Sequence, residues 1–314
     1  MKTYTDRYRY LFGPVPSRRL GRSLGIDIIP HKICTLNCIY CEVGRTTECI
    51  TDRRHFDDPD GIVEEFRVNY PLLKDGLDVV TVTGAGEPTL NLDMGYIIGE
   101  IKKISEHPVA VLTNTTLFTD EKVRSELSRA DIVVPSIDAA TPDVYRRICA
   151  PHRSLDVAVI NEALVKFSNG YSGRLLIEVL LCEGINDGPE ELSKIAEIIK
   201  RCRYELVQLN TVHRPPAFVR AKAVSEKCLI DTALLFKSAG IKVEPAGNYI
   251  KQLTGGELTP EQLARLLSMR PCSADDISRV FGVDDSFVAE TLAVLDASRL
   301  KISEHNGEKF YFFV

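Results

Sequence analysis

Short apolar runs rich in β-branched residues alternate with longer amphipathic segments along most of the chain. The apolar runs have the length and composition of strands, and they cover residues 24–29, 78–83, 108–113, 131–136, 174–181 and 205–212. The segments between these runs have the periodicity of helices. One of them repeats apolar residues at i, i+3, i+4, i+7 and i+10, namely Leu192, Ile195, Ala196, Ile199 and Cys202. This alternation predicts repeated βα units around a mainly parallel sheet.

Six such units favour a partial (β/α)6 barrel over a doubly wound sheet, although the pattern separates these two α/β folds poorly. Residues 241–244 are a weak candidate for a seventh strand. We expect this domain to cover residues 23–255. In a barrel the active site lies at the carboxyl ends of the strands, so the residues that follow each strand are the first candidates for chemistry.

The pattern changes near residue 255, where two glycines interrupt it and Pro260 then opens a helical segment. Three short helical patterns follow, and then two strand-like runs flank the Asn-Gly pair of residues 306–307. Three helices and an Asn-Gly hairpin are the layout of a winged helix, which we expect over residues 256–314. Residues 1–22 precede the first predicted strand and are expected to form a basic N-terminal arm.

Length and composition are those of an ordinary globular protein. The 314 residues suffice for one large α/β domain with a small appendage, and 44% of them are hydrophobic and 26% charged, with a formal net charge of -5. Residues 1–10 alternate tyrosine with charge, and no run of about 18 apolar residues occurs, so we expect neither secretion nor a membrane span.

Three of the nine cysteines crowd into eight residues directly after the first predicted strand, as Cys34, Cys38 and Cys41. The uneven set is unlike a secreted disulfide framework, so we expect a reducing compartment, the cytoplasm. Three thiolates from one loop can hold three irons of a cubane and leave the fourth iron open. An open iron can chelate the amino and carboxylate groups of S-adenosylmethionine (SAM).

A structural zinc site is the alternative for these cysteines, with His31 or Cys49 as a fourth ligand. Zinc ligands often come as two separated pairs, and the chain has no second C-x2-C pair. The unequal spacing after a strand therefore favours an iron-sulfur cluster over zinc.

The cysteine motif, with Tyr40 directly before its last cysteine, resembles that of the radical SAM superfamily. Further stretches resemble one branch, the uncharacterised iron-sulfur oxidoreductases related to tRNA wyosine-synthesis enzymes, and they cover residues 12–27, 84–90, 135–142, 184–187 and 208–216. The resemblance implies a TIM-like radical SAM barrel, SAM as cofactor, and a [4Fe-4S] cluster on Cys34, Cys38 and Cys41. It also implies reductive cleavage of SAM to a 5'-deoxyadenosyl radical, with reduced ferredoxin or flavodoxin as electron donor. The substrate would be a tRNA base, a peptide or a small metabolite.

The resemblance also assigns residues at the strand ends to the cofactor. Residues 84–87 match the superfamily's Gly-Gly-Glu segment, which receives the methionine ammonium, although the second glycine is displaced here. Glycines let a backbone approach a ligand closely, and a carboxylate suits an ammonium. Polar residues at later strand ends would meet the ribose and the methionine carboxylate, with helix capping as their alternative role. The cofactor candidates are Tyr40, Gly84, Ala85, Gly86, Glu87, Asn114, Ser136 and Asp138.

Other polar residues are candidates for the substrate. The N-terminal segment carries several arginines, and guanidinium groups suit phosphate or carboxylate, although a solvated basic arm is the alternative. Glu178 lies in an apolar strand, where an unpaired carboxylate is costly, so we expect it to point into the barrel or to pair with a cation. The substrate candidates are Arg18, Arg19, Arg22, Glu178, Asn210, His213 and Arg214.

An iron-sulfur redox-sensing DNA-binding regulator is the rival interpretation, because winged helices often bind DNA. DNA binding needs a basic face, whereas residues 257–314 carry six Lys or Arg against ten Asp or Glu, a net charge of -4. The sensor interpretation also gives no reason for the polar residues at successive strand ends. We therefore expect a radical SAM enzyme of unknown substrate.

Overall fold

A computed structural model describes residues 8–30, 32–245 and 258–313. Its centre is an eight-stranded sheet in the order β1-β2-β5-β6-β7-β8-β9-β10, in which β1 and β2 pair antiparallel and the other neighbours pair parallel. The strands are β1 (Leu11–Ser17), β2 (Gly21–Asp27), β5 (Val79–Thr83), β6 (Val109–Thr113), β7 (Ile132–Pro135), β8 (Arg174–Leu181), β9 (Leu206–Thr211) and β10 (Val243–Pro245). All six predicted strands are present, and the weak seventh candidate overlaps β10. The expected α/β fold with a mostly parallel sheet is confirmed.

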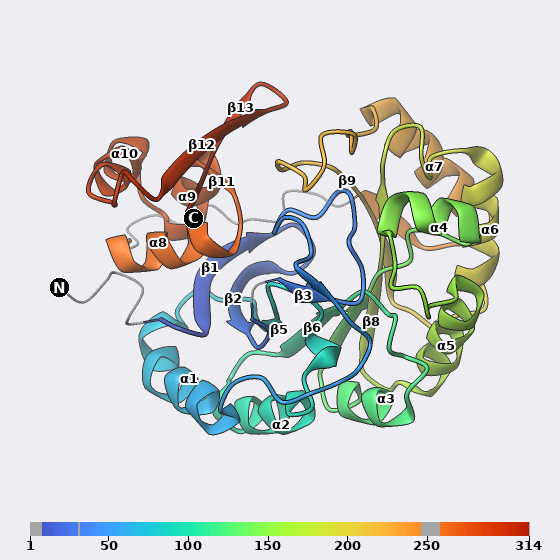
Figure 1. Cartoon of the computed structure of the whole chain (residues 1–314), viewed down its shortest axis with the longest axis horizontal. Coiled ribbons are helices and arrows are strands. Elements are labelled where there is room, and N and C mark those ends of the chain that lie inside the picture. The colour runs from blue at the N-terminus through green and yellow to red at the C-terminus, as the bar shows by residue number, and fades with distance from the viewer. Residues whose placement is uncertain (1–7, 31, 246–257, 314) are drawn as a thin grey trace.

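Helices connect the parallel strands and lie in an arc along one side of the sheet (Figure 1). They are α1 (Pro59–Leu73), α2 (Met94–Ile104), α3 (Glu121–Leu127), α4 (Pro142–Cys149), α5 (Val157–Gly170), α6 (Pro189–Ile199) and α7 (Glu226–Ser238), with a 3-10 turn η1 (Pro88–Leu90) after β5. Between β2 and α1, two short strands, β3 (Ile33–Cys34) and β4 (Glu48–Cys49), pair with each other. No described helix combines the length and the apolar character needed to cross a bilayer.

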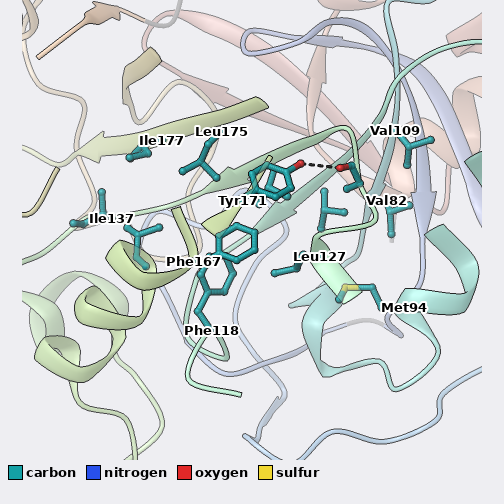
Figure 2. Packing of buried hydrophobic residues seen from close by; sticks show 14 of the residues in the cluster. Val82, Met94, Val109, Phe118, Leu127, Ile137, Phe167, Tyr171, Leu175 and Ile177 are labelled. Carbon is teal, nitrogen blue, oxygen red and sulfur yellow. Dashed lines mark hydrogen bonds between the residues drawn. The ribbon is translucent and has the colours of Figure 1, made fainter. Parts of the chain in front are cut away.

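The two faces of the sheet differ, because successive residues of a strand point to opposite sides. The face under the helices is apolar, and Figure 2 shows part of this core, in which the ring centroids of Phe118 and Phe167 lie 4.7 Å apart. The opposite face, here called the inner face, has an apolar cluster of Val79, Ala110, Ile132, Val134 and Leu176. Further along the same strands, towards their carboxyl ends, the inner face is polar, with Thr81, Thr83, Glu178, Gln208 and Asn210.

Part of the segment expected as a basic arm forms strand β1, the antiparallel edge of the sheet. Pro14 and Pro16 lie in this strand, and an edge strand tolerates proline because part of its backbone needs no partner. Those prolines hid the strand from the sequence pattern. The turn after β1 reaches the inner face, where Leu20 packs against the apolar cluster and Gln208 Nε2 donates a hydrogen bond to Arg19 O at 3.1 Å.

Residues 258–313, here called the C-terminal module, lie beside β1 (Figure 1). The module contains α8 (Pro260–Met269), β11 (Cys272–Ser273), α9 (Ala274–Phe281), α10 (Asp285–Ala293), β12 (Leu300–His305) and β13 (Glu308–Phe313). Its strands form a sheet in the order β11-β13-β12, and its apolar core includes Phe12 and Val15 of β1. The predicted domain boundary near residue 255 lies outside the described residues.

A buried ion pair anchors the chain just after residues 33–49, the segment here called the cysteine loop. The Arg53 guanidinium pairs with Glu126 of α3, and it also donates hydrogen bonds to Thr89 O at 2.8 Å and Asn91 O at 2.9 Å. Both side chains of the pair are less than a tenth exposed, so loss of one would leave the other as an unpaired buried charge. The next residue, Arg54, pairs instead with Glu48 at the surface, at 2.7 Å.

We predict that Arg53→Met lowers the free energy of unfolding by about 3–5 kcal/mol, because Glu126 then lacks its buried counter-ion. Arg54→Met is the matched control and should leave the free energy nearly unchanged, since its ion pair is exposed and screened. Chemical denaturation of the two variants measures the difference. Equal losses in both would show that Arg53 is not an anchor.

Candidate active site

The cysteine loop is fixed at the carboxyl ends of the parallel strands. On one side Glu87 N, after β5, donates a hydrogen bond to Ile33 O at 3.1 Å. On another side Asn37 N donates to Cys149 O, at the end of α4, at 3.0 Å. The loop therefore brings three thiols to the edge of the sheet at which a site is expected, and they belong to Cys34, Cys38 and Cys41.

Lys32, two residues before the cysteine motif, is buried beside its three cysteines. The side chain is 4% exposed, and its Nζ donates a hydrogen bond to Cys41 Sγ at 2.9 Å. Burial lowers the pKa of Lys32, but attraction to Cys41, Cys34 and Cys38 outweighs burial and raises it. Within the described residues Lys32 forms no ion pair with a carboxylate. A buried ammonium needs a counter-charge, and the cysteine sulfurs are placed to supply it.

The other two cysteines also have hydrogen-bond donors. Asn114 Nδ2 donates to Cys34 Sγ at 3.5 Å. A hydrogen bond between Cys38 and Cys149 is the main cause of a lowered pKa at Cys38 and a raised pKa at Cys149, so Cys149 is the donor. Burial raises the pKa of the Cys34 thiol to about 12, so iron binding would displace a proton from it.

Three cysteines of one loop form a donor set that fits an iron-sulfur cluster. In the described part of the chain, no three His, Cys, Asp or Glu side chains are grouped so as to hold one ion. The cysteine ligands of a cubane bind different irons, so they need not converge on one point. Of the alternative zinc ligands, Cys49 is exposed and its Sγ donates to Thr35 O at 3.5 Å, and His31 lies outside the described residues.

The segment expected to contact SAM, residues 84–87, is packed against the cysteine loop. A Cβ at Gly86 would lie 1.6 Å from Ile33 O, so only glycine fits there. From the sequence we expected that glycine here lets a ligand approach the backbone. In the structure, glycine at this position lets two backbone segments of the protein lie in contact. Ala85 N donates a hydrogen bond to Asp27 Oδ1, at the end of β2, at 3.0 Å, which fixes the segment from a second side.

Glu87 is buried, and its hydrogen bonds are all to the protein. Its Oε1 accepts from the hydroxyls of Thr89 and Thr113 at 2.6 Å, and its Oε2 accepts from Asn114 N at 2.8 Å. Burial raises the pKa of Glu87, while these hydrogen bonds oppose the rise. Through both carboxylate oxygens, Glu87 thus positions the ends of β5 and β6.

Asn114 and Ser136 follow β6 and β7. Asn114 Nδ2 donates to Thr35 Oγ1 at 2.8 Å and its Oδ1 accepts from Thr116 Oγ1 at 2.7 Å, so the amide is locked against the cysteine loop. The Ser136 hydroxyl has no hydrogen-bond partner among the described residues, which leaves it free for a ligand. Neither residue has the alternative role of helix cap, because the N-caps of α3 and α4 are Asp120 and Thr141.

Tyr40 and Asp138, both cofactor candidates, contact each other. The Tyr40 hydroxyl donates to Asp138 Oδ2, and Asp138 Oδ1 accepts from Leu180 N at 2.9 Å. Burial raises the pKa of Asp138 to about 7, and the hydrogen bonds from Tyr40 and Leu180 limit the rise. The pair ties the residue before Cys41 to the end of β7 and so orients the cysteine loop.

Glu178 is paired on the inner face, as the cost of its burial predicted. Its Oε1 accepts from Arg19 Nε at 2.5 Å and from Asn210 Nδ2 at 2.9 Å. Arg19 comes from the turn between β1 and β2, whereas Asn210 belongs to β9. The three side chains therefore join the first turn of the described chain to the far strands of the sheet.

A cavity of about 160 Å3 beside Cys41 brings together most substrate candidates, and it is lined by Arg18, Arg19, Asn210, His213 and Arg214. Gly84 lines a neighbouring cavity of about 90 Å3 on the inner face. Arg22 is the exception among the arginines. Its guanidinium donates to Asp75 O at 3.2 Å and its backbone N donates to Asp78 Oδ2 at 2.7 Å, at the amino end of β5. Arg22 thus lies at the wrong end of the sheet for the role predicted.

The C-terminal module is tied to this region by ion pairs. Arg214, after β9, donates to Glu42 of the cysteine loop at 3.2 Å and to Asp276 of α9 at 3.0 Å. Burial raises the pKa of Glu42, but Arg214 and other arginines outweigh it and lower the pKa to about 2. Arg265 of α8 donates to Asp27 at 3.3 Å. Arg214 therefore connects two parts of the protein, in addition to lining the cavity.

Three further residues lie at the site although the sequence did not indicate them, namely Lys32, Cys149 and Arg270. Lys32 had a usable signal, because a lysine in the apolar stretch before the cysteines would be buried and would need a counter-charge. Nothing in the sequence around Cys149 or Arg270 indicates that these residues lie at the site. They reach the site only through the folding of segments far apart in the sequence.

Comparisons with known proteins identify the family of the chain. The family model of the radical SAM superfamily matches residues 28–169. A UPF0026 protein of Helicobacter pylori is 33% identical over 304 residues, which cover 96% of this chain and 96% of that protein. A protein of Brachyspira hyodysenteriae described as GTPase Obg is 35% identical over 305 residues, which cover 96% of this chain but 45% of that protein. The chain thus spans less than half the length of that relative.

The crystal structure of a radical SAM methyltransferase from Sphaerobacter thermophilus superposes with a TM-score of 0.53 at 16% identity. The superposition covers 71% of this chain and 66% of that one, and it supports the fold. The family match, the UPF0026 relative and the shared fold lead to one assignment. The chain belongs to the UPF0026 family and to the radical SAM superfamily, and it is a radical SAM enzyme.

Proposed function

We propose that the chain holds a [4Fe-4S] cluster on Cys34, Cys38 and Cys41 and uses it to cleave SAM reductively. Membership of the superfamily implies an iron-sulfur cluster and SAM. The observation that carries the proposal is the buried ammonium of Lys32, whose Nζ donates a hydrogen bond to Cys41 Sγ at 2.9 Å within the cysteine motif. Thiolates are the form in which cysteine binds iron, so an ammonium beside Cys41 favours the charge state that a cluster ligand needs.

When bound, the cluster would supply the electron that splits SAM into methionine and a 5'-deoxyadenosyl radical, which removes hydrogen from the substrate. The chain's own residues prepare the site for this reaction. Lys32 and Asn114 hold the cysteine loop through Cys41 and Cys34. The free hydroxyl of Ser136 and the backbone of residues 84–86 are the groups that we assign to SAM.

We further propose that the parallel sheet is the partial (β/α)6 barrel that the resemblance implies, and that the C-terminal module is a winged helix. The order of three helices and a final hairpin supports the second assignment. The network of Arg19, Glu178 and Asn210 would form the floor of the substrate site on the inner face. A tRNA base, a peptide and a small metabolite are the candidate substrates.

The electron would come from reduced ferredoxin or flavodoxin, and we assign the reaction to the cytoplasm. All nine cysteines are unpaired, which suits a reducing compartment. The DNA-binding regulator is not favoured. Asp276 of α9 is engaged by Arg214, and a module that packs against the enzyme site is explained without DNA.

We predict that Cys38→Ala abolishes formation of 5'-deoxyadenosine, because two cysteines no longer hold the cubane. The assay is anaerobic, with iron and sulfide reconstituted and with SAM and dithionite added. Cys49→Ala is the matched control, since Cys49 is exposed and outside the motif, and it should retain the activity of the parent protein. Equal activity in both variants would contradict the assigned ligands.

We also predict that Lys32→Met makes the reduction potential of the reconstituted cluster more negative by about 60 mV or more, a tenfold change in a one-electron equilibrium. A reduced cluster carries one more negative charge, which the nearby ammonium stabilises. Lys32→Arg keeps the charge and should keep most of the potential. Redox titration followed by electron paramagnetic resonance measures all three proteins, and an unchanged potential in Lys32→Met would exclude this electrostatic role.

A further inference from the structure

The cavity of about 160 Å3 beside Cys41 has a strongly basic wall. Its arginines come from three parts of the chain, namely the turn after β1, the segment after β9 and the C-terminal module, and they are Arg18, Arg19, Arg214 and Arg270. Among the described residues that line it, Glu42 alone is acidic. The charges of the four guanidinium groups must therefore be balanced in part from elsewhere.

Three of these arginines have counter-ions. Arg19 pairs with Glu178 at 2.5 Å, and Arg214 and Arg270 share Glu42 at 3.2 Å and 3.8 Å. Arg214 has a second acidic partner in α9 of the C-terminal module, at 3.0 Å. Because the acidic residues at the cavity already pair with these three arginines, little negative charge remains to balance the fourth.

Arg18 is the cation without a partner. Among the described residues its guanidinium makes neither a hydrogen bond nor an ion pair, although the side chain is half-buried. Burial lowers the pKa of Arg18 to about 10, and repulsion from Arg214 adds to the effect, while attraction to Asp276 and Glu42 opposes it without outweighing it. A half-buried guanidinium among other cations gains most from a bound anion, because five donors and one charge are then satisfied together.

We propose that Arg18 anchors an anion-binding subsite, and that the substrate is a small molecule that carries a carboxylate or a phosphate there. The inference rests on the proposed function, because it places the anionic group of the substrate beside the cluster ligand Cys41. His213 and Arg270 line the same cavity and add donors to it. Arg270 belongs to the C-terminal module, so the module completes the subsite.

Size and charge favour a small molecule over a nucleic acid. The subsite shares Glu42 and Arg270 with a larger cavity of about 730 Å3 between the cysteine loop and the C-terminal module, which leaves room for the rest of a metabolite. Three acidic residues and four arginines line that larger cavity, namely Asp27, Glu42, Asp57, Arg9, Arg265, Arg270 and Arg299. Residues 258–313 carry nine Asp or Glu and six Lys or Arg, a balance that opposes a polyanion.

The subsite adjoins the segment assigned to SAM, because Ser17, Arg19, Glu42 and Arg270 line both cavities. Residues 84–87 do not line the cavity that contains Arg18, whereas Gly84 lines the neighbouring cavity of about 90 Å3. A second carboxylate in the reaction, that of the methionine part of SAM, is therefore expected elsewhere. Loss of Arg18 should weaken the binding of substrate anions and spare the binding of SAM.

The test uses the full chain with its cluster reconstituted, and two probes, sulfate for a phosphate group and acetate for a carboxylate. Each probe is compared with chloride at equal ionic strength, and the melting temperature is measured, since a ligand of the folded state raises it. We expect at least one probe to raise the melting temperature of the parent protein. Arg18→Gln should bind that probe at least tenfold more weakly, whereas Arg18→Lys should retain part of the effect.

Arg67→Gln is the control, because Arg67 is an exposed residue of α1, and it should respond to the probes like the parent protein. No effect of either probe on the parent protein, or an equal effect on Arg18→Gln, would overturn the proposal. So would a loss of SAM affinity in Arg18→Gln that equals the loss of probe affinity, because Arg18 would then hold the cofactor. Absence of 5'-deoxyadenosine formation in the parent protein would instead refute the proposed function, independently of the probe result.

Discussion

The carboxylate of Glu87 joins the segments that build the site. It is buried at the end of β5, it accepts hydrogen bonds from Thr113 and Asn114 at the end of β6, and its own backbone N–H binds the cysteine loop. Asn114, fixed in this way, donates to Cys34. A buried carboxylate tolerates few alternative arrangements, because each lost hydrogen bond leaves a charge unsatisfied. The relative position of the strand ends and the cysteines therefore depends on this one group.

A second set of charges determines how the cysteine loop meets the C-terminal module. Glu42 lies directly after the last cysteine of the motif and pairs with Arg214, which in turn pairs with Asp276. Asp27 has a similar position, since one oxygen accepts from Ala85 and the other from Arg265 of α8. Glu42 and Asp27 both lie next to segments that we assign to the cofactors. Glu42 is joined to the module through Arg214, and Asp27 is joined to it directly by Arg265. The module is therefore part of the site's architecture and not an independent attachment.

The sequence predicted the parallel strands well, because their β-branched runs are buried on both faces and leave a strong local signal. It missed β1, since the prolines of that strand resemble a loop and only its edge position accommodates them. The cysteine loop and the pairing of Glu178 were also predictable, from spacing and from the cost of burial. The separation of Arg22 from Arg18 and Arg19 was not, because three neighbouring arginines look alike until the turn after β1 directs them to opposite ends of the sheet.

The position of β1 has a consequence for folding during synthesis. One face of this strand is covered by the C-terminal module, and Arg265 of α8 donates a hydrogen bond to Leu11 O across 254 residues of chain. Because β1 precedes α8 in the sequence, it leaves the ribosome well before its cover does. Until the module emerges from the ribosome, Phe12 and Val15 lack their packing partners and their apolar side chains are exposed to other chains. A chain that ends before α8 would thus form a nearly complete sheet with an exposed apolar patch on β1.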